Sequence, residues 1–294
     1  MANATSGTLG PLSWFNGTMP EWQKVAQKNP LVDFVDYCLR GVGQVCFMNN
    51  PVTGAFIVAG MFVFDAWLGV AGLVGLAVST LAAILLGFDR GAIRAGLYGF
   101  NGILVGAGLA TFLGPKWDGS AFGWIILISA LSSVFHAALA SVMIRVWKVP
   151  PFTLAFNLAS LMFLVGALNF ANGRLAGAIP PVQPTITAGQ VDTGFYSVST
   201  DGQAADILTA IFNGIGQLFF AEDVIGGILI VVGLLVCSRI AGIMALFGSA
   251  VGMLIGLALG ASGAAIYDGL WGFNSFDAAI AVGGVFFVLS WRSV

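Results

Sequence analysis

Charged residues are scarce in this chain. Of its 294 residues only 8% are Asp, Glu, Lys or Arg, whereas 58% are hydrophobic. An ordinary globular domain carries about 25% charged residues, so too few polar groups are present here to cover a core of this size with a water-facing surface. The composition excludes a soluble globular protein and predicts an integral membrane protein.

Other absences narrow the function. The 11 basic and 13 acidic residues form no basic tract, which argues against a nucleic-acid partner. The three cysteines, Cys38, Cys46 and Cys237, have neither an even number nor ligand spacing, so we expect no disulfide and no metal site. A single histidine, His136, and the absence of HExxH and GxSxG motifs leave no catalytic set, so we predict neither an enzyme nor a cofactor.

Hydrophobic residues form long runs instead. Apolar stretches cover 31–48, 52–69, 70–87, 95–113, 122–147, 152–171, 204–220, 224–242, 243–262 and 266–291. Several are shorter than the about 20 residues of a full helical crossing, and Gly or Asn interrupts them. At membrane depth a broken helix persists only where protein or a polar cavity satisfies its free backbone groups. We therefore predict an all-α membrane protein that contains a permeation path.

The sequence repeats itself at a constant spacing. GVGQVCFMNNPVTG at 41–54 matches GIGQLFFAEDVIGG at 214–227, and GLYGFN at 96–101 matches GLWGFN at 269–274. Both matches have an offset of 173 positions. A constant register over this distance indicates an internal duplication. If each copy has an odd number of crossings, the second copy has the opposite orientation in the membrane.

The duplication predicts the organisation of the chain. A polar N-terminal segment at 1–30, without the pattern of a cleaved signal peptide, precedes the first membrane repeat at 31–171. A connector at 172–203 is rich in Pro, Thr and Gly and leads to the second repeat at 204–294. The counterpart of Thr153 would fall at position 326, so we expect the second repeat to be incomplete by about fifty residues.

Four segments resemble signature segments of the urea transporter family, in the family's order and from about residue 35 onward: GQVCFMNNPVTG, GLYGFNGILVG, VPPFTLAFN and GLWGFNS. The resemblance implies passive, channel-like transport of urea or a similar small neutral amide, without a cofactor. It also implies a homotrimer in the lipid bilayer of the cell (inner) membrane. Each protomer would hold its own pore between two inverted-topology halves of about five crossings plus a tilted half-helix.

The same resemblance assigns roles to residues of the first repeat. Phe47 and Phe100 match phenylalanines that form the walls of the pore, and Leu104 matches an apolar residue beside them. Gln44 matches a polar residue at a mouth of the pore, and Thr153 matches a hydroxyl at its midpoint. All five are expected to line a narrow slot for the solute.

In the second repeat, Gln217, Phe220 and Phe273 are the counterparts of Gln44, Phe47 and Phe100, and we expect them to line the slot as well. Asp277, which we also expect to line the slot, departs from the pattern, because it stands where the counterpart of Leu104 would be. An acid within a membrane span is a functional hypothesis by default.

These departures leave alternatives open. Asp277, together with Glu222 and Asp223 at the second mouth, also fits a transporter for a related amide, for ammonium or for another cation-coupled solute. Coupling to an ion would draw on Asp65, His136 or Asp277, although we expect His136 to be tied to a backbone carbonyl. A degenerate paralogue that does not transport is the third alternative.

Overall fold

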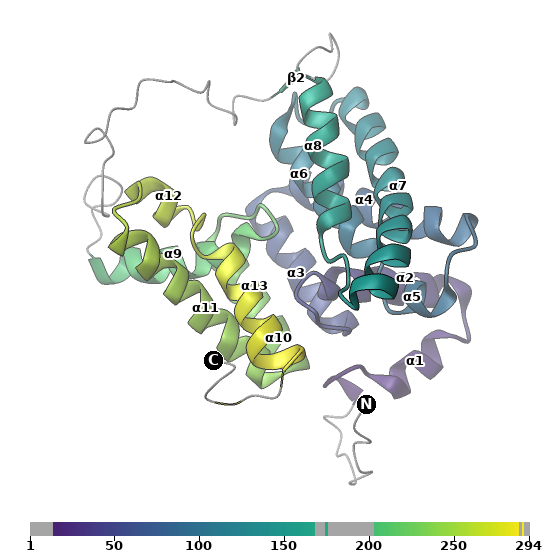
Figure 1. Cartoon of the computed structure of the whole chain (residues 1–294), viewed down its shortest axis with the longest axis horizontal. Helices are drawn as coiled ribbons and strands as arrows, with labels where there is room; N and C mark the ends of the chain where they lie inside the picture. The colour runs from purple at the N-terminus through teal and green to yellow at the C-terminus, as the bar shows by residue number, and fades with distance from the viewer. Residues whose placement is uncertain (1–13, 168–173, 176–202, 288–289, 291–294) are drawn as a thin grey trace.

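The computed structural model describes residues 14–167, 174–175, 203–287 and 290, and these residues are almost entirely helical (Figure 1). The first part contains α1 (Pro20–Ala26), α2 (Pro30–Gln44), α3 (Pro51–Phe64), α4 (Ala66–Leu85), α5 (Arg90–Arg94), α6 (Gly99–Phe112), α7 (Gly119–Val142), the π-helical η2 (Met143–Trp147) and α8 (Leu154–Ala167). The second part contains α9 (Gln203–Gln217), α10 (Val224–Cys237), α11 (Arg239–Ala258), α12 (Gly263–Tyr267), α13 (Phe273–Ile280) and the π-helical η3 (Ala281–Val285).

Strands among the described residues form one short ladder. Strand β1 (Leu113–Gly114) pairs antiparallel with β2 (Arg174–Leu175), which falls within the predicted connector. The apolar helices otherwise confirm the predicted all-α membrane protein. Residues 1–13 and most of the predicted connector lie outside the described residues, as do 288–289 and 291–294.

Helix lengths fall into two classes. Within the described ranges, three stretches are long and apolar enough to cross a membrane: Ala66–Leu85, Gly119–Trp147 and Arg239–Ala258. The apolar helices α3, α6, α8 and α10 have 14 residues each. At 1.5 Å per residue such a helix spans about 21 Å, less than the about 30 Å of a hydrocarbon core. The prediction of short, interrupted helices is therefore confirmed.

Helix boundaries recur 173 positions later. Helices α2, α3, α4 and α5 correspond residue for residue to α9, α10, α11 and α12, with the same lengths. Helix α6 corresponds to α13 followed by η3, which together end at Val285, the counterpart of Phe112. The left-handed glycines recur as well, since Gly96 and Gly269 have φ values of 75° and 84°.

The recurring boundaries follow from matching caps. The Asn50 side chain accepts hydrogen bonds from the backbone N–H groups of Val52 and Thr53, at 2.8 and 3.0 Å, at the start of α3. Asp223, its counterpart, accepts one from Gly226 at 2.7 Å at the start of α10. Both residue types satisfy the free N–H groups of a first helical turn. Asp223 thus serves as a helix cap.

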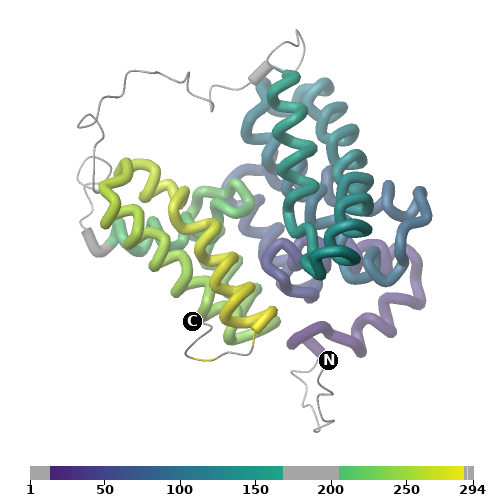
Figure 2. The backbone as a smooth tube through the Cα atoms, in the orientation of Figure 1, coloured from purple at the N-terminus to yellow at the C-terminus, as the bar shows by residue number. Residues whose placement is uncertain are grey.

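The helices of the first part, purple to teal, and those of the second part, green to yellow, form two groups (Figure 2). The two groups meet along α3 and α10, where Thr53 Oγ1 donates a buried 2.7 Å hydrogen bond to the carbonyl of Gly233. A Cβ atom on Gly60 would lie 3.0 Å from the carbonyl oxygen of Gly226, and one on Gly233 would lie 3.2 Å from that of Thr53. Glycine at these positions permits close backbone approach between apolar helices, where burial in lipid gives no extra attraction.

Candidate functional site: an aromatic cavity between α6 and α13

A cavity of about 340 Å³ opens beside the N-terminal half of α6. Its lining residues come from both parts of the chain: Gln44, Val45, Phe47, Leu97, Phe100, His136, Ile144, Pro150, Pro151, Phe152, Thr153, Asp277, Val285 and Phe286. One water molecule needs roughly 10–15 Å³ of such space, so the cavity can hold a small solute together with water. Five of the residues predicted from the sequence to line one slot therefore lie around this cavity: Gln44, Phe47, Phe100, Thr153 and Asp277.

Three phenylalanine rings form one wall. Phe47 lies with its ring centroid 5.9 Å from that of Phe152 and 5.5 Å from that of Phe286. The Phe152 and Phe286 rings are 5.6 Å apart. All three pairs meet edge to face, an arrangement that fixes the rings against one another. The wall is therefore apolar and held in place by its own contacts, and its three rings lie nearly perpendicular to one another.

The backbone conformation of Phe47 is unusual for its residue type. The N–H of Phe47 donates to the carbonyl of Gln44 at 3.0 Å, and the N–H of Met48 donates to that of Gly43 at 2.9 Å. These two bonds define a Schellman turn, which normally places Gly at the left-handed position. Phe47 occupies that position with φ 62°, at a cost of about 1–2 kcal/mol. Strained positions of this kind cluster at functional sites.

The counterpart of this turn has the same geometry. Phe220 has φ 58°, and its N–H donates to the carbonyl of Gln217 at 3.0 Å, while the N–H of Ala221 donates to that of Gly216 at 3.1 Å. A phenylalanine thus takes the left-handed position, where glycine would be less strained, in both copies. The recurrence indicates that the aromatic side chain, and not the turn alone, is required at this position.

Gln44 combines a structural bond with a free acceptor. Its Nε2 donates a 2.9 Å hydrogen bond to the carbonyl of Ala95, which joins the end of α2 to the turn before α6. Among the described residues, no hydrogen bond reaches its Oε1 or the hydroxyl of Thr153. Both groups line the cavity and can accept hydrogen bonds from a solute.

His136 is held by Asn101. The Asn101 Oδ1 accepts from the backbone N–H of Phe156 at 2.9 Å, so its Nδ2 faces His136 Nδ1 at 3.1 Å. An amide nitrogen can only donate, so Nδ1 accepts and the neutral ring carries its proton on Nε2. The sequence-based expectation of a backbone carbonyl partner is wrong, because a neighbouring helix offers a side-chain amide instead.

Four predicted site residues lie away from this cavity. Leu104 is 2% exposed within the core, and neither Gln217 nor Phe273 lines the cavity. Phe220 packs edge to face against Phe112 and Phe156, with centroids 6.0 and 6.3 Å away. It also lies against Gly108, eight residues beyond Phe100 along α6, which corresponds to about 12 Å. The cavity that Phe47 lines therefore lies beside the N-terminal half of α6, whereas Phe220 packs against its C-terminal half.

Sequence reasoning did not assign the other lining residues to the cavity, among them His136, Phe152 and Phe286. Phe152 directly precedes the predicted site residue Thr153 in the VPPFT segment. This proximity was the signal by which the sequence could have identified Phe152 as a lining residue. Phe286 is the counterpart of Leu113, so the repeat gave no reason to expect an aromatic ring there.

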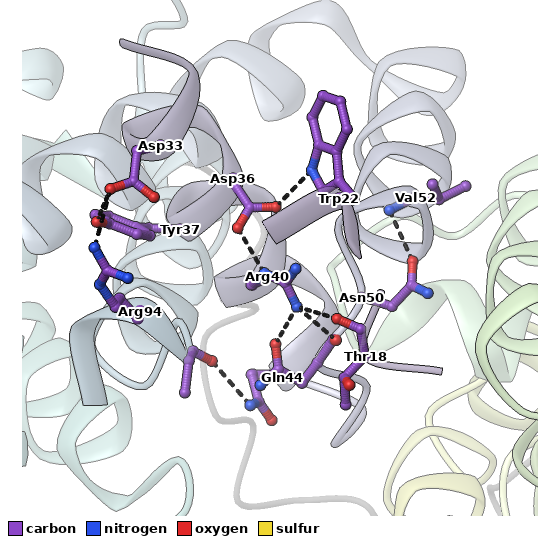
Figure 3. Close-up of polar contacts among 12 residues, drawn as sticks. Thr18, Trp22, Asp33, Asp36, Tyr37, Arg40, Gln44, Asn50, Val52 and Arg94 are labelled. Carbon is purple, nitrogen blue, oxygen red and sulfur yellow. Dashed lines mark hydrogen bonds and ion pairs between the residues drawn. The ribbon is translucent and has the colours of Figure 1, made fainter. Parts of the chain in front are cut away.

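A buried ion pair supports the turn that carries Phe47 (Figure 3). Arg40 Nε donates to Asp36 Oδ2 at 2.7 Å, and both side chains are 1% exposed or less. Arg40 Nη1 also donates to the carbonyls of Thr18 and Asn49, at 2.8 and 3.0 Å. Trp22 Nε1 donates to Asp36 Oδ1 at 2.9 Å. A buried pair is tolerated when further hydrogen bonds satisfy its charges, so this pair serves to join α1, α2 and the turn.

The segment before α1 reaches the second half of the chain. Asn50 Nδ2 donates to the carbonyls of Phe15 and Gly17 at 2.9 and 2.7 Å. The N–H of Gly17 in turn donates to the carbonyl of Cys237 at 3.2 Å, at the end of α10. This segment therefore contacts both parts of the chain beside the cavity.

A multi-pass helical membrane protein with an aromatic cavity and few polar groups belongs to the class of membrane transporters for small solutes. Comparison with known proteins gives the family. The sequence model described as "Urea transporter" matches residues 35–294, and the chain belongs to the urea transporter family.

Similar proteins include urea transporter 1 of Rattus norvegicus, which is 36% identical over 292 residues, covering 97% of this chain and 72% of the relative. Urea transporter 1 of Mus musculus is 37% identical over 289 residues, covering 96% and 71%. The protein of the same name from Ovis aries is 36% identical over 289 residues, with the same coverage. These matches confirm the family predicted from the signature segments and the prediction of a transporter rather than an enzyme.

Proposed function

We propose that the protein conducts urea passively across a membrane through a slot that begins at the aromatic cavity. Gln44, Phe47, Phe100 and Thr153 line one end of the slot, and Phe220 lies at the other end of α6. The observation that carries this proposal is the cavity itself, which brings together residues from both copies around flat rings and hydrogen-bond acceptors.

The chemistry of urea fits these walls. Urea is planar and uncharged, with N–H donors along its edges and faces that tolerate apolar contact. The rings of Phe47, Phe152 and Phe286 offer flat apolar surfaces, while Gln44 Oε1 and the Thr153 hydroxyl offer acceptors at the edges. Acceptors that replace lost hydration lower the barrier to entering a narrow pore.

The proposed slot lies between two inverted repeats. Gly60 of the first copy approaches Gly226 of the second, and Thr53 of the first copy approaches Gly233 of the second. Gly233 is the counterpart of Gly60 and Gly226 is the counterpart of Thr53, so the two contacts are equivalent. Reciprocal contacts of this form are typical of a two-fold axis. They support a pseudo-twofold arrangement of the copies 31–171 and 204–294, with the solute path near the axis.

Passive transport is favoured over ion coupling because two of the acidic residues in the helical region already have ion-pair partners. Asp65 pairs with Lys116 at the junction of α3 and α4, and Asp36 pairs with Arg40. Both acids therefore have fixed partners, whereas a coupling site needs a group that can exchange its ion. Asp277 is the candidate that keeps the coupled alternative open.

Family membership and exposed apolar surface support the further assignment to a homotrimer in the cell (inner) membrane. In the single chain, α8 exposes large apolar side chains, with Leu161, Met162 and Val165 at 58%, 65% and 65% exposure. Such a surface is stable against lipid or a neighbouring subunit, and not against water.

The test is urea flux in proteoliposomes made with the purified chain. A urea gradient should dissipate without any imposed proton or sodium gradient, whereas a coupled transporter requires one and a degenerate paralogue gives only the flux of empty vesicles. Phe47→Ala should change the ratio of urea to water permeability by about tenfold, the equivalent of roughly 1.4 kcal/mol of barrier. Phe247→Ala, an exposed ring outside the cavity, is the matched control and should leave the ratio unchanged.

A further inference from the structure

Asp277 is the acidic residue among those that line the aromatic cavity, and it lacks a counter-charge. Its Oδ1 is shielded from solvent and has no hydrogen-bond partner among the described residues. The ion pairs of the described ranges do not include it. The other titratable side chain in the lining is His136, whose Nδ1 accepts from Asn101 in the neutral ring and therefore offers no positive charge.

The fold itself does not require an acid at this position. Leu104, the counterpart of Asp277 in the first copy, is 2% exposed and packs in the core. An unpaired carboxylate in an apolar setting is strongly unfavourable, so a leucine would be the stabilising choice if packing alone decided the residue. The carboxyl group is explained better by a ligand that enters the cavity.

We propose that the cavity also binds planar, N–H-rich cations of the guanidinium class, with Asp277 as their counter-ion. The inference rests on the proposed function, because guanidinium has the flat shape of urea with the carbonyl oxygen replaced by a third nitrogen. A carboxylate accepts short, charge-assisted hydrogen bonds from the N–H groups of such an ion. The rings of Phe47, Phe152 and Phe286 supply faces on which a planar cation stacks.

A second acceptor completes the recognition of the cation. Gln44 Oε1 lines the same cavity and has no partner among the described residues, so it can accept an N–H that the carboxylate does not reach. Guanidinium and urea would bind to the same cavity walls and the same hydrogen-bond acceptors, so the binding of one would exclude the other from the cavity. Guanidinium should therefore inhibit urea flux competitively, through a contact that urea lacks.

The experiment measures urea flux into proteoliposomes with increasing guanidinium chloride below denaturing concentrations, against sodium chloride at equal ionic strength. Wild-type protein should be inhibited by guanidinium and not by sodium. Asp277→Asn and Asp277→Leu should weaken the inhibition at least about tenfold, as expected when a charge-assisted contact disappears. Asp118→Asn, which preserves the cap of α7 outside the cavity, should be inhibited like wild type.

Equal inhibition of wild type and both Asp277 variants, or wild-type urea flux that guanidinium leaves untouched, would overturn the proposal. Binding of radiolabelled guanidinium to the purified, monodisperse proteins gives a second readout that needs no transport. If wild type carries no urea flux but binds guanidinium in an Asp277-dependent way, the proposed function fails and the cation site stands. If urea flux is present and binding does not depend on Asp277, the cation site fails alone.

Discussion

The two copies of the repeat share their backbone and differ in their chemistry. The first copy has the pair Asp36–Arg40, supported by Asn49, whereas the second has Thr209, Asn213 and Glu222 at the equivalent positions. Asn213 donates to the carbonyl of Tyr267 at 2.9 Å instead.

The boundaries of four helix pairs and the left-handed turns nevertheless recur in both copies. The comparison teaches that the backbone of each mouth is set by local turn and cap geometry, while the polar groups around it are free to vary.

The largest expected effect is on the buried pair. Arg40→Ala leaves Asp36 charged and uncompensated, so the free energy of unfolding should fall by about 3–5 kcal/mol. Thermal unfolding in detergent measures this loss. The double variant Asp36→Thr/Arg40→Asn copies the second half, removes both charges together and should recover much of the stability. If the double variant is no more stable than Arg40→Ala, the neutral side chains of the second copy cannot replace the Asp36–Arg40 pair in the first.

A smaller effect is expected where the copies meet. Gly60→Ala and Gly233→Ala each place a methyl group against the backbone of the other copy, and each should lower stability by about 1–3 kcal/mol. Similar losses at both positions would sharpen the two-fold relationship, whereas a loss at one position alone would break it. Gly123→Ala is the control, since nothing lies within 4 Å of an added Cβ and α7 is helical there; it should be neutral or slightly stabilising.

The smallest expected effect is a difference in the pH dependence of stability between α4 and α11, whose caps differ in charge. Asp65 caps α4 and pairs with Lys116, whereas its counterpart Ser238 caps α11 without charge. Partial burial tends to raise the pKa of Asp65, but the bonds to Lys116 and to the N–H of Trp67 outweigh it and hold that pKa below its usual value.

A lowered folded-state pKa means that Asp65 stabilises the protein above the carboxyl's unfolded pKa and loses this contribution as pH falls through the folded pKa. The pair is partly exposed, so the loss is under about 1 kcal/mol. Hydrogen exchange at decreasing pH should show α4 opening before α11, and Asp65→Asn, which keeps the cap, should remove that difference. Equal opening of both helices in wild type would contradict this account.

The sequence was sufficient for the all-α membrane class and for the family, because composition indicates the first and the signature segments indicate the second. It also identified five lining residues of the cavity, of which Gln44, Phe47 and Phe100 lie on short helices or their end turns. The positions of Gln217, Phe220 and Phe273 could not be read from equivalence between copies. A two-fold relationship places equivalent residues apart from one another, so they need not share one space.

Polar contacts between helices were the other part that sequence could not supply. The bond between Asn101 and His136 joins residues 35 positions apart, and the Asp36–Arg40 pair depends on a segment before α1 whose docking leaves no periodic pattern. Such contacts are set by tertiary packing, which has no signature in hydropathy.

The contact between Gly17 and Cys237 has a consequence for biogenesis. The two residues are 220 positions apart in the sequence, so their hydrogen bond can form only after α10 has been synthesised. Contacts of such long sequence separation form slowly. The segment around Gly17 is synthesised long before α10, and yet it makes its bond to Cys237 only after the nascent chain has delivered that part of the second copy.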